Sequence, residues 1–157
     1  MALEKSIKRF RLTHGEVIAE HDAGRTYSNQ TWAIDDKIRL IGISMFLDVG
    51  RGTLSGGCEN SDVSADLACY SGGGYDTERL LKMVRRLFVD DYTIGAATHM
   101  GNFGSPFGEL VMMFPSGYGI DFEKGDYLNS ALTLQALNWN GGNASASGSV
   151  IFYYVER

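Results

Sequence analysis

Apolar and polar residues alternate along much of the C-terminal third of the chain. Ile120 and Phe122 alternate with acidic residues, and a period of two is typical of a strand with one buried and one solvated face. Residues 132–136 repeat the pattern. Between the two segments Gly125 lies in a turn sequence, where glycine adopts a positive φ at little cost. This end of the chain is therefore predicted to be a β-meander.

The last apolar segment, Val150–Val155, is rich in β-branched and aromatic residues and contains no glycine or proline, which favours a strand. Both of its faces are apolar, so we expect them to be covered by a second sheet or by a neighbouring subunit. Phe152 and Tyr154 are accordingly candidate protein-contact residues. The segment 140–148 contains only Asn, Gly, Ala and Ser and is predicted to be a flexible hairpin tip.

The first half of the chain holds a second strong apolar segment, 37–49. Its alternate residues are almost wholly apolar, and we expect this set to face inward from a central strand: Arg39, Ile41, Ile43, Met45, Leu47 and Val49. Shorter strands are predicted elsewhere by the same criteria, and loops are predicted at 22–30, 50–64 and 99–108. The short strands are 6–12, 16–20, 31–34, 65–70, 90–97 and 109–114.

One segment departs from the strand pattern. From Thr77 to Phe88, apolar residues recur at helical spacing, while basic residues fall on the opposite face. Asp76 or Thr77 is a suitable N-cap, and Glu78 lies near the positive end of the helix dipole. The spacing predicts one short amphipathic helix here.

The number of predicted strands, about nine, favours an all-β, jelly-roll-like antiparallel β-sandwich with this one helix. The chain has 157 residues, and the absence of a long Ser/Pro linker indicates a single domain over 1–157. Hydrophobic residues make up 44% and charged residues 21%, which excludes a disordered composition. The 20 glycines against 2 prolines suit many tight turns between short strands.

The formal net charge of −5 argues against broad nucleic-acid binding, which needs a basic surface. A local basic group occurs near the N-terminus: Lys5, Lys8, Arg9 and Arg11. These residues form either a basic arm over 1–13 that docks on an acidic surface, or the solvated face of a strand. No secretory signal and no apolar run long enough to cross a membrane is visible, so we expect synthesis in a cytoplasm and no membrane contact.

No catalytic motif is complete, so we expect neither an enzyme nor a cofactor. Three histidines, His14, His21 and His99, either form a metal site or are ordinary surface and turn residues, and the lack of a His-x-His pair favours the second. Cys58 and Cys69 are the only cysteines. One disulfide or two free thiols are compatible with them, and we expect free thiols.

Three carboxylates lie close together in the sequence: Asp121, Glu123 and Asp126. Such a group suits general acid/base chemistry or Ca²⁺ binding, but a solvated strand face beside a turn is the simpler interpretation. Among the aromatic residues, Tyr118 and Trp139 are candidate glycan contacts, with core or subunit packing as the alternative.

The run 119–128, followed by a strand, a Gly/Ser/Asn hairpin and the run 149–155, resembles the C-terminal strands of jelly-roll proteins on virus particles. These proteins include tailed-phage capsid decoration (cement) proteins and fibre-head domains. The resemblance implies a non-enzymatic structural protein of the virion, a homotrimer that binds and stabilises the capsid shell. The alternative is a carbohydrate- or receptor-binding module, such as a fibre head.

Overall fold

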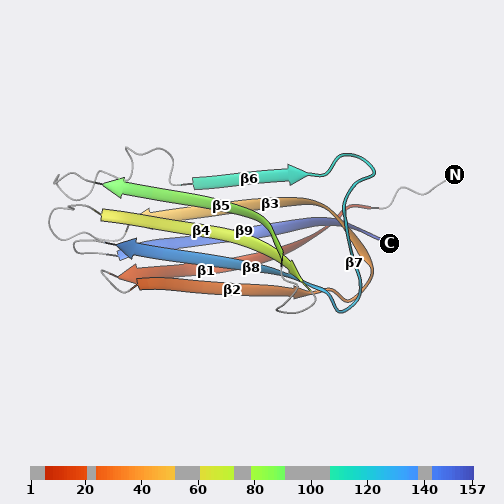
Figure 1. Cartoon of the computed structure of the whole chain (residues 1–157), viewed down its shortest axis with the longest axis horizontal. Coiled ribbons are helices and arrows are strands. Elements are labelled where there is room, and N and C mark those ends of the chain that lie inside the picture. The colour runs from red at the N-terminus through yellow and green to blue at the C-terminus, as the bar shows by residue number, and fades with distance from the viewer. Residues whose placement is uncertain (1–5, 21–23, 52–60, 73–78, 91–106, 138–142) are drawn as a thin grey trace.

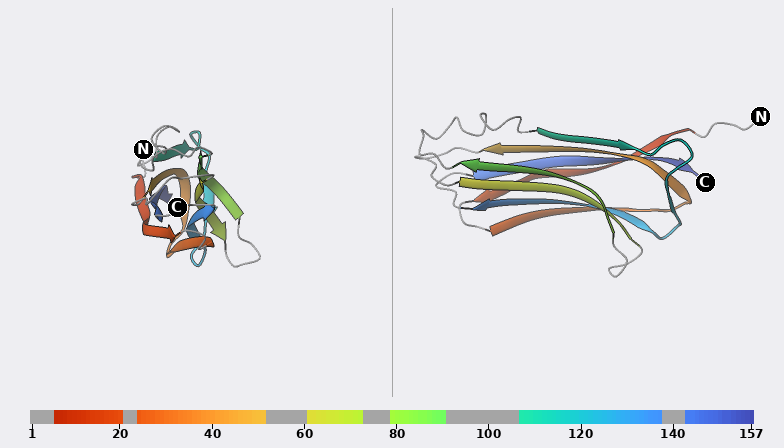
Figure 2. Two further views of the ribbon diagram at one scale, coloured as in Figure 1. Left: turned by 90° about the vertical axis from the view of Figure 1, so that its left-hand side faces the viewer. Right: turned by 45° about the horizontal axis from the view of Figure 1, so that its top comes forward.

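A computed structural model describes residues 6–20, 24–51, 61–72, 79–90, 107–137 and 143–157 of the chain. The described part contains nine strands: β1 Lys8–Glu20, β2 Gly24–Ala33, β3 Ile38–Arg51, β4 Ser61–Gly72, β5 Arg79–Asp90, β6 Phe107–Met113, β7 Ile120–Phe122, β8 Tyr127–Leu137 and β9 Asn143–Glu156. They form two antiparallel sheets packed face to face in an elongated sandwich (Figures 1 and 2).

The strand order identifies the architecture. Sheet A has the order β1-β9-β3-β6, with the short β7 also paired to β3, and sheet B has the order β2-β8-β4-β5. The pairs are nested: β4 with β5, β3 with β6, β2 with β8, and β1 with β9. This nesting is the pattern of a long antiparallel ribbon rolled into two sheets, which is a jelly roll. The prediction of an all-β, jelly-roll-like sandwich is confirmed.

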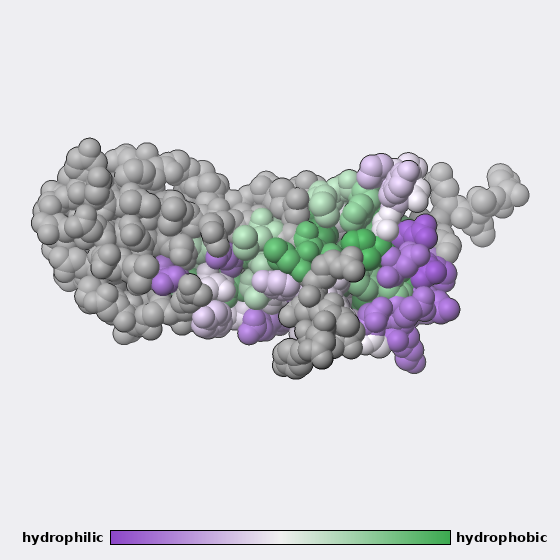
Figure 3. Space-filling view, in the orientation of Figure 1, coloured by the Kyte–Doolittle hydropathy of each residue, from purple (hydrophilic) through white to green (hydrophobic). Residues whose placement is uncertain are grey.

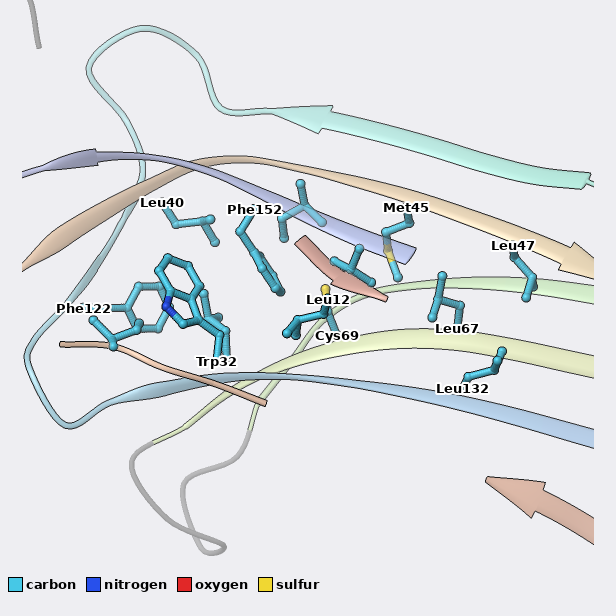
Figure 4. Packing of buried hydrophobic residues seen from close by; sticks show 14 of the residues in the cluster. Leu12, Trp32, Leu40, Met45, Leu47, Leu67, Cys69, Phe122, Leu132 and Phe152 are labelled. Atoms are coloured by element: carbon cyan, nitrogen blue, oxygen red, sulfur yellow. The ribbon is translucent and has the colours of Figure 1, made fainter. Parts of the chain in front are cut away.

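The core lies between the sheets and is built from alternate residues of each strand. In β3 the inward face carries Ile43, Met45 and Leu47, all fully buried, as the sequence predicts. Figure 4 shows Met45 and Leu47 pointing into this core. An irregularity in pairing between Leu40 and Gly42 shifts the alternation. Leu40 is therefore buried and Ile41 is only half-buried, which corrects the predicted inward set at that position.

Aromatic rings fill one end of the core. Phe10 stacks on Trp32 with ring centroids 4.2 Å apart and an interplanar angle of 5°. Tyr154 and Phe152 lie against the same indole at 5.0 and 6.1 Å. These rings come from β1, β2 and β9, so their packing joins the two sheets at this end.

The predicted helix over Thr77–Phe88 is wrong. Residues Arg79–Asp90 form β5, which pairs along its whole length with β4 at the edge of sheet B. Residues 77–78 lie outside the described residues. Leu80 and Met83 are exposed while Leu81 packs against the core, so apolar side chains lie on both faces of this part of the strand and imitate a helical period.

Three further segments differ from the predictions. The predicted loop at 22–30 contains most of β2, and residues 16–20 continue β1 through an irregularity between His14 and Val17. Residues 143–148 of the predicted hairpin tip begin β9. Gly125 has the expected positive φ, 98°. The predicted strand 90–97 and the predicted loop 99–108 lie almost wholly outside the described residues.

The first and last described residues lie at the same end of the sandwich (Figure 1). Strands β1 and β9, which carry them, are paired from Lys8 opposite Tyr154 onward. In the described part of the chain, no helix is long and apolar enough to cross a membrane.

Candidate functional site: two edges and an outer face

The two long edges of the sandwich differ in chemistry. The first edge is formed by β1 and β2, which are edge strands of sheets A and B and contact each other. Most of its exposed side chains are polar or charged: Lys8, Arg9, Arg11, Asn29, Gln30 and Thr31. Ile18 of β1 and Tyr27 of β2 are exceptions, at 48% and 58% exposed. Charged and polar side chains on edge strands disfavour pairing with another chain. Most of this edge is therefore suited to contact with water.

The opposite edge is formed by β5 and β6 and carries apolar side chains. Leu80, Met83 and Met113 are 50%, 41% and 50% exposed. Leu81 and Met112 are half-buried and pack against the core. Leu80 and Met83 face outward from sheet B, whereas Met113 lies over Gly42 on the outer face of sheet A. We call these five residues, which span both sheets at this edge, the β5–β6 patch. Figure 3 shows hydrophobic residues gathered in this region, between the end of β6 and the start of β5.

The backbone adds to the interaction capacity of the β5–β6 patch. Within the described residues β5 pairs only with β4, and β6 pairs only with β3, so each strand has one edge without a strand partner. Exposed apolar groups on such edges mark sites of protein association. Of the described surfaces, the β5–β6 patch is thus the one best suited to bind another protein.

The outer face of sheet A carries a second group of contact candidates. Phe152, predicted as a contact residue, is fully buried, and Tyr154 is half-buried against Trp32. The outward-facing residues of β9 are instead Ile151 and Tyr153, which are half-buried. Because alternate residues of β9 face opposite sides of the sheet, Phe152 points into the core and not outward.

Two of the predicted basic residues flank this outer face. The Arg9 guanidinium lies 5.6 Å from the centroid of the Tyr153 ring, a distance typical of cation–π attraction. Arg11 is opposite Ile151 in the β1–β9 pairing. The solvated-strand interpretation holds for residues 8–11, because they belong to β1 and not to a free arm. Lys5 lies outside the described residues.

Other predicted site residues are placed as follows. Lys8 forms an ion pair with Glu156, and the Glu156 carboxylate raises the pKa of Lys8 through a hydrogen bond and its charge. Tyr118 is 70% exposed in a turn closed by its N–H donating to the Pro115 carbonyl at 2.9 Å. Cys69 is buried. Cys58 and Trp139 lie outside the described residues.

His14 joins the two sheets through a buried polar contact. Its ring nitrogens Nδ1 and Nε2 lie 2.9 Å from Ser28 Oγ and 2.8 Å from Ser130 Oγ. Ser28 and Ser130 belong to β2 and β8 of the other sheet. The imidazole is 1% exposed, and its burial lowers the pKa of His14 below the ordinary value of 6.5. His14 is therefore held between hydroxyl groups, while His21 and His99 lie outside the described residues.

The carboxylates predicted as acid/base or Ca²⁺ candidates are paired with cations. Asp121 accepts two hydrogen bonds from Arg39, at 2.6 and 3.0 Å. These hydrogen bonds are the main reason that the pKa of Asp121 is lowered. Glu123 accepts a hydrogen bond from Arg157 at 3.0 Å and lies 3.6 Å from Lys37. These contacts tie β7 to β3 and to the last residue.

No group of three or more metal-ligating side chains occurs among residues whose positions are described. Asp126 instead caps the turn after β7, because its carboxylate accepts the Glu123 N–H at 2.9 Å.

No protein-family model matches the chain, and no curated protein sequence matches it. Among solved structures, the chain is similar to one of the Gx strain of infectious bursal disease virus, with 15% identity, a TM-score of 0.40 and coverage of 96% of this chain and 32% of that chain. A VP2 subviral particle of the same virus gives 12% identity, a TM-score of 0.39 and coverage of 96% and 33%. T=1 particles derived from that virus give 12% identity, a TM-score of 0.32 and coverage of 96% and 32%.

The chain therefore spans about a third of the length of these viral proteins. The assignment of the jelly roll rests on the strand order of this chain and not on these likenesses.

Proposed function

We propose that the chain is a non-enzymatic structural protein of a virus particle and acts as a capsid decoration (cement) protein. Jelly-roll sandwiches recur in capsid proteins and in lectins, so the fold narrows the choice without deciding it. The observation that carries the proposal is the β5–β6 patch, an apolar surface on two edge strands. A protein that stiffens a shell needs such a surface, because it must bury area against neighbouring subunits.

The free energy gained by burying the β5–β6 patch is modest, which suits an assembly of many copies. Complete burial of a Leu or Met side chain contributes about 1.5–3 kcal/mol. Leu80, Met83 and Met113 are about half-exposed, so burial of their exposed halves contributes about 1 kcal/mol each. One copy therefore gains only a few kcal/mol from these residues. Several copies that bind the shell together multiply such modest contacts through avidity.

The proposed partners are the chain itself, as a homotrimer, and the capsid proteins of the shell. Sheet A offers Arg9 and Arg11 beside Tyr153, and these cations suit electrostatic docking on an acidic subunit. The proposed location is the virion, and nucleic acid and membrane are not among the proposed partners.

The absolute mass of the protein in solution, measured by light scattering, tests the self-association. We expect a trimer for the natural chain and a monomer for the double variant Leu80→Glu/Met83→Glu. The matched control is Thr13→Glu/Thr31→Glu, which adds the same charge at exposed positions of the polar edge and should remain a trimer. Thermal unfolding of each variant separates loss of association from loss of folding.

Co-sedimentation with the particle that carries the protein tests binding to the shell. We expect the natural chain and the Thr13→Glu/Thr31→Glu control to sediment with particles, and the patch variant to remain in solution. A natural chain that is monomeric at micromolar concentration and also fails to sediment with particles would overturn the proposal.

A second candidate function is that of a carbohydrate- or receptor-binding module. The 70% exposure of the Tyr118 ring favours it, since exposed aromatic rings with a polar end are common contact groups. Glycan-array binding that disappears on Tyr118→Ala or Trp139→Ala would support this function over the first.

A further inference from the structure

The outer face of sheet B contains a groove of about 410 Å³, formed by β2, β4 and β8. The registers explain why it is hollow. Ala131 of β8 lies opposite Asn29 on one side and Ala68 on the other. Because Ala131 and Ala68 have small side chains, the middle of this row is low. The next row across the sheet, Thr31–Asn129–Tyr70, rises beside it.

The groove is polar but uncharged. Asn29 and Asn129 offer carboxamide groups on this face of the sheet, and Thr31 and Tyr70 offer hydroxyl groups. Gln30 borders the groove between Asn29 and Thr31, but its side chain belongs to the other face of β2. No carboxylate, ammonium or guanidinium group lines it among the described residues. A carboxamide offers both hydrogen-bond donors and an acceptor, and a hydroxyl group offers both roles as well. A ligand that fits this lining carries many neutral groups that both donate and accept.

Tyrosine rings complete the surface. Tyr70 is half-buried at one wall of the groove. Tyr27 is 58% exposed and stands on the same face of β2, two residues from Asn29, because successive side chains of a strand alternate between faces. Tyrosine presents an apolar ring with a hydroxyl group at its end and loses little conformational entropy on contact. Such rings pack against the apolar C–H faces of a sugar while the carboxamides bond its hydroxyl groups.

We propose that this groove binds an uncharged oligosaccharide. Its volume lies within the range of about 300–1,000 Å³ that is usual for small-molecule sites. An acidic or sulfated glycan would need a cation to offset its charge, and none lines the groove in the described part of the chain. A purely apolar ligand would displace water from polar groups such as the exposed Asn29 carboxamide without replacing its hydrogen bonds. A neutral glycan satisfies both the polar lining and the rings.

The groove and the β5–β6 patch are neighbours on the outer face of sheet B. Tyr70, which lines the groove, lies opposite Leu80 in the β4–β5 pairing, and Ala68 lies opposite Met83. A partner protein that covers Leu80 and Met83 therefore also approaches the groove. The glycan proposal rests on the lining of the groove and not on the proposed decoration role, and it is tested on the free protein without particles.

The test is an NMR titration of the ¹⁵N-labelled full chain with three neutral probes: chitotriose, mannotriose and N-acetyllactosamine. We expect at least one probe to shift the backbone amide signals of residues 29–31 and 129–131. We expect sialyllactose, tested as an acidic comparison, to bind no more tightly than the neutral probe. Titration with a second unlabelled protein in place of a sugar distinguishes a peptide ligand.

Two substitutions locate the binding. Ala131→Leu fills the groove from its floor, and Asn29→Ala removes one carboxamide from an exposed position. Each should weaken binding at least tenfold. The matched control is Thr13→Ala, an exposed position on the outer face of the other sheet, which should leave affinity unchanged. Dispersed amide spectra of the three variants show that they fold.

The proposal fails if none of the neutral probes shifts the groove signals. It also fails if Ala131→Leu binds as well as the natural chain, or if only the acidic probe binds.

Discussion

The buried His14 makes a sharp prediction about acid stability. The imidazole is 1% exposed and lies between two serine hydroxyls. When neutral, it satisfies both, since one ring nitrogen donates to a serine oxygen and the other accepts a hydroxyl hydrogen. Protonation would place a positive charge in the core, and the two hydrogen-bond partners of the ring, Ser28 and Ser130, carry no negative charge to offset it. Burial therefore lowers the pKa of His14.

The sign of the pH dependence follows from proton binding in the two states. Above pH 6.5 the ring is neutral in both the folded and the unfolded chain, so His14 contributes no pH dependence. Below the unfolded pKa of 6.5, the unfolded state binds a proton and the folded state does not. The free energy of unfolding then falls by up to about 1.4 kcal/mol for each pH unit. This loss continues down to the lowered pKa of the folded state.

The assay compares the natural chain with His14→Gln by urea unfolding at a series of pH values from neutral downward. Glutamine keeps a donor and an acceptor near both serines but cannot take a proton in this range. The other ionisable groups are the same in both proteins, so the difference between the two curves isolates His14. We expect the natural chain to lose stability relative to His14→Gln as the pH falls below 6.5.

The magnitude decides the outcome. If the folded protein does not protonate His14 at all, the free energy of unfolding of the natural chain falls relative to that of His14→Gln. The difference is about 1.4 kcal/mol for each pH unit in which the unfolded ring is charged. Parallel curves down to pH 5 would refute the reasoning, because they would mean that the folded protein takes up the proton as readily as the unfolded chain.

Three further predictions concern packing and the surface ion pairs. Gly148→Ala places a Cβ 2.8 Å from a backbone oxygen of β3 and should lower the free energy of unfolding by about 1–3 kcal/mol. Gly15→Ala is the control, because its Cβ meets nothing within 4 Å, and it should change stability by less than about 0.5 kcal/mol. Thermal unfolding measures both. Trp32→Ala removes a buried ring from between the sheets and should cost about 3–5 kcal/mol in urea unfolding. Arg39→Ala removes the hydrogen bonds that lower the pKa of Asp121, so an NMR titration of that carboxyl should show its pKa rise toward 3.8. The stability that the pair contributes is present above pH 3.8 and is lost as the pH falls through the lowered pKa of Asp121.

The sheet architecture was predictable where strands have one wet and one buried face. β7 and β8 follow the period of two in the sequence, and Gly125 takes the positive φ that its turn requires. Residues 24–30 of β2 were missed, whereas residues 31–33 fall within the predicted strand 31–34, because most side chains of 24–30 are polar and the strand lies at an edge. Its sequence therefore looks like a loop, although it pairs with β8 over ten residues.

The error at β5 has the opposite cause. Leu80 and Met83 are exposed on the outer face of the strand, while Leu81 packs toward the core. Apolar residues on both faces hide the period of two and produce a helical spacing. The apolar residues that obscure the strand period thus belong to the β5–β6 patch, on which the proposed function rests.

The placement of the candidate contact residues could be predicted only in part. Arg9 and Arg11 are exposed on β1, as the solvated-strand interpretation requires. Phe152 and Tyr154 were chosen as contacts but face inward, because a strand that is apolar on both faces does not show which alternate residues point into the core. The groove on sheet B could not be found from sequence, since Ala68 and Ala131 are brought together only by the pairing of β4 with β8.

The position of β9 also sets when the protein can fold during synthesis. β9 lies between β1 and β3, and it pairs with residues made more than ninety positions earlier. β1 has no other strand partner in the described part of the chain, so sheet A cannot be completed until residues 143–156 have left the ribosome. Such long-range pairing slows folding, and the apolar inner faces of the earlier strands stay uncovered while it is awaited. Nascent chains are therefore expected to be most prone to aggregation just before the last strand appears.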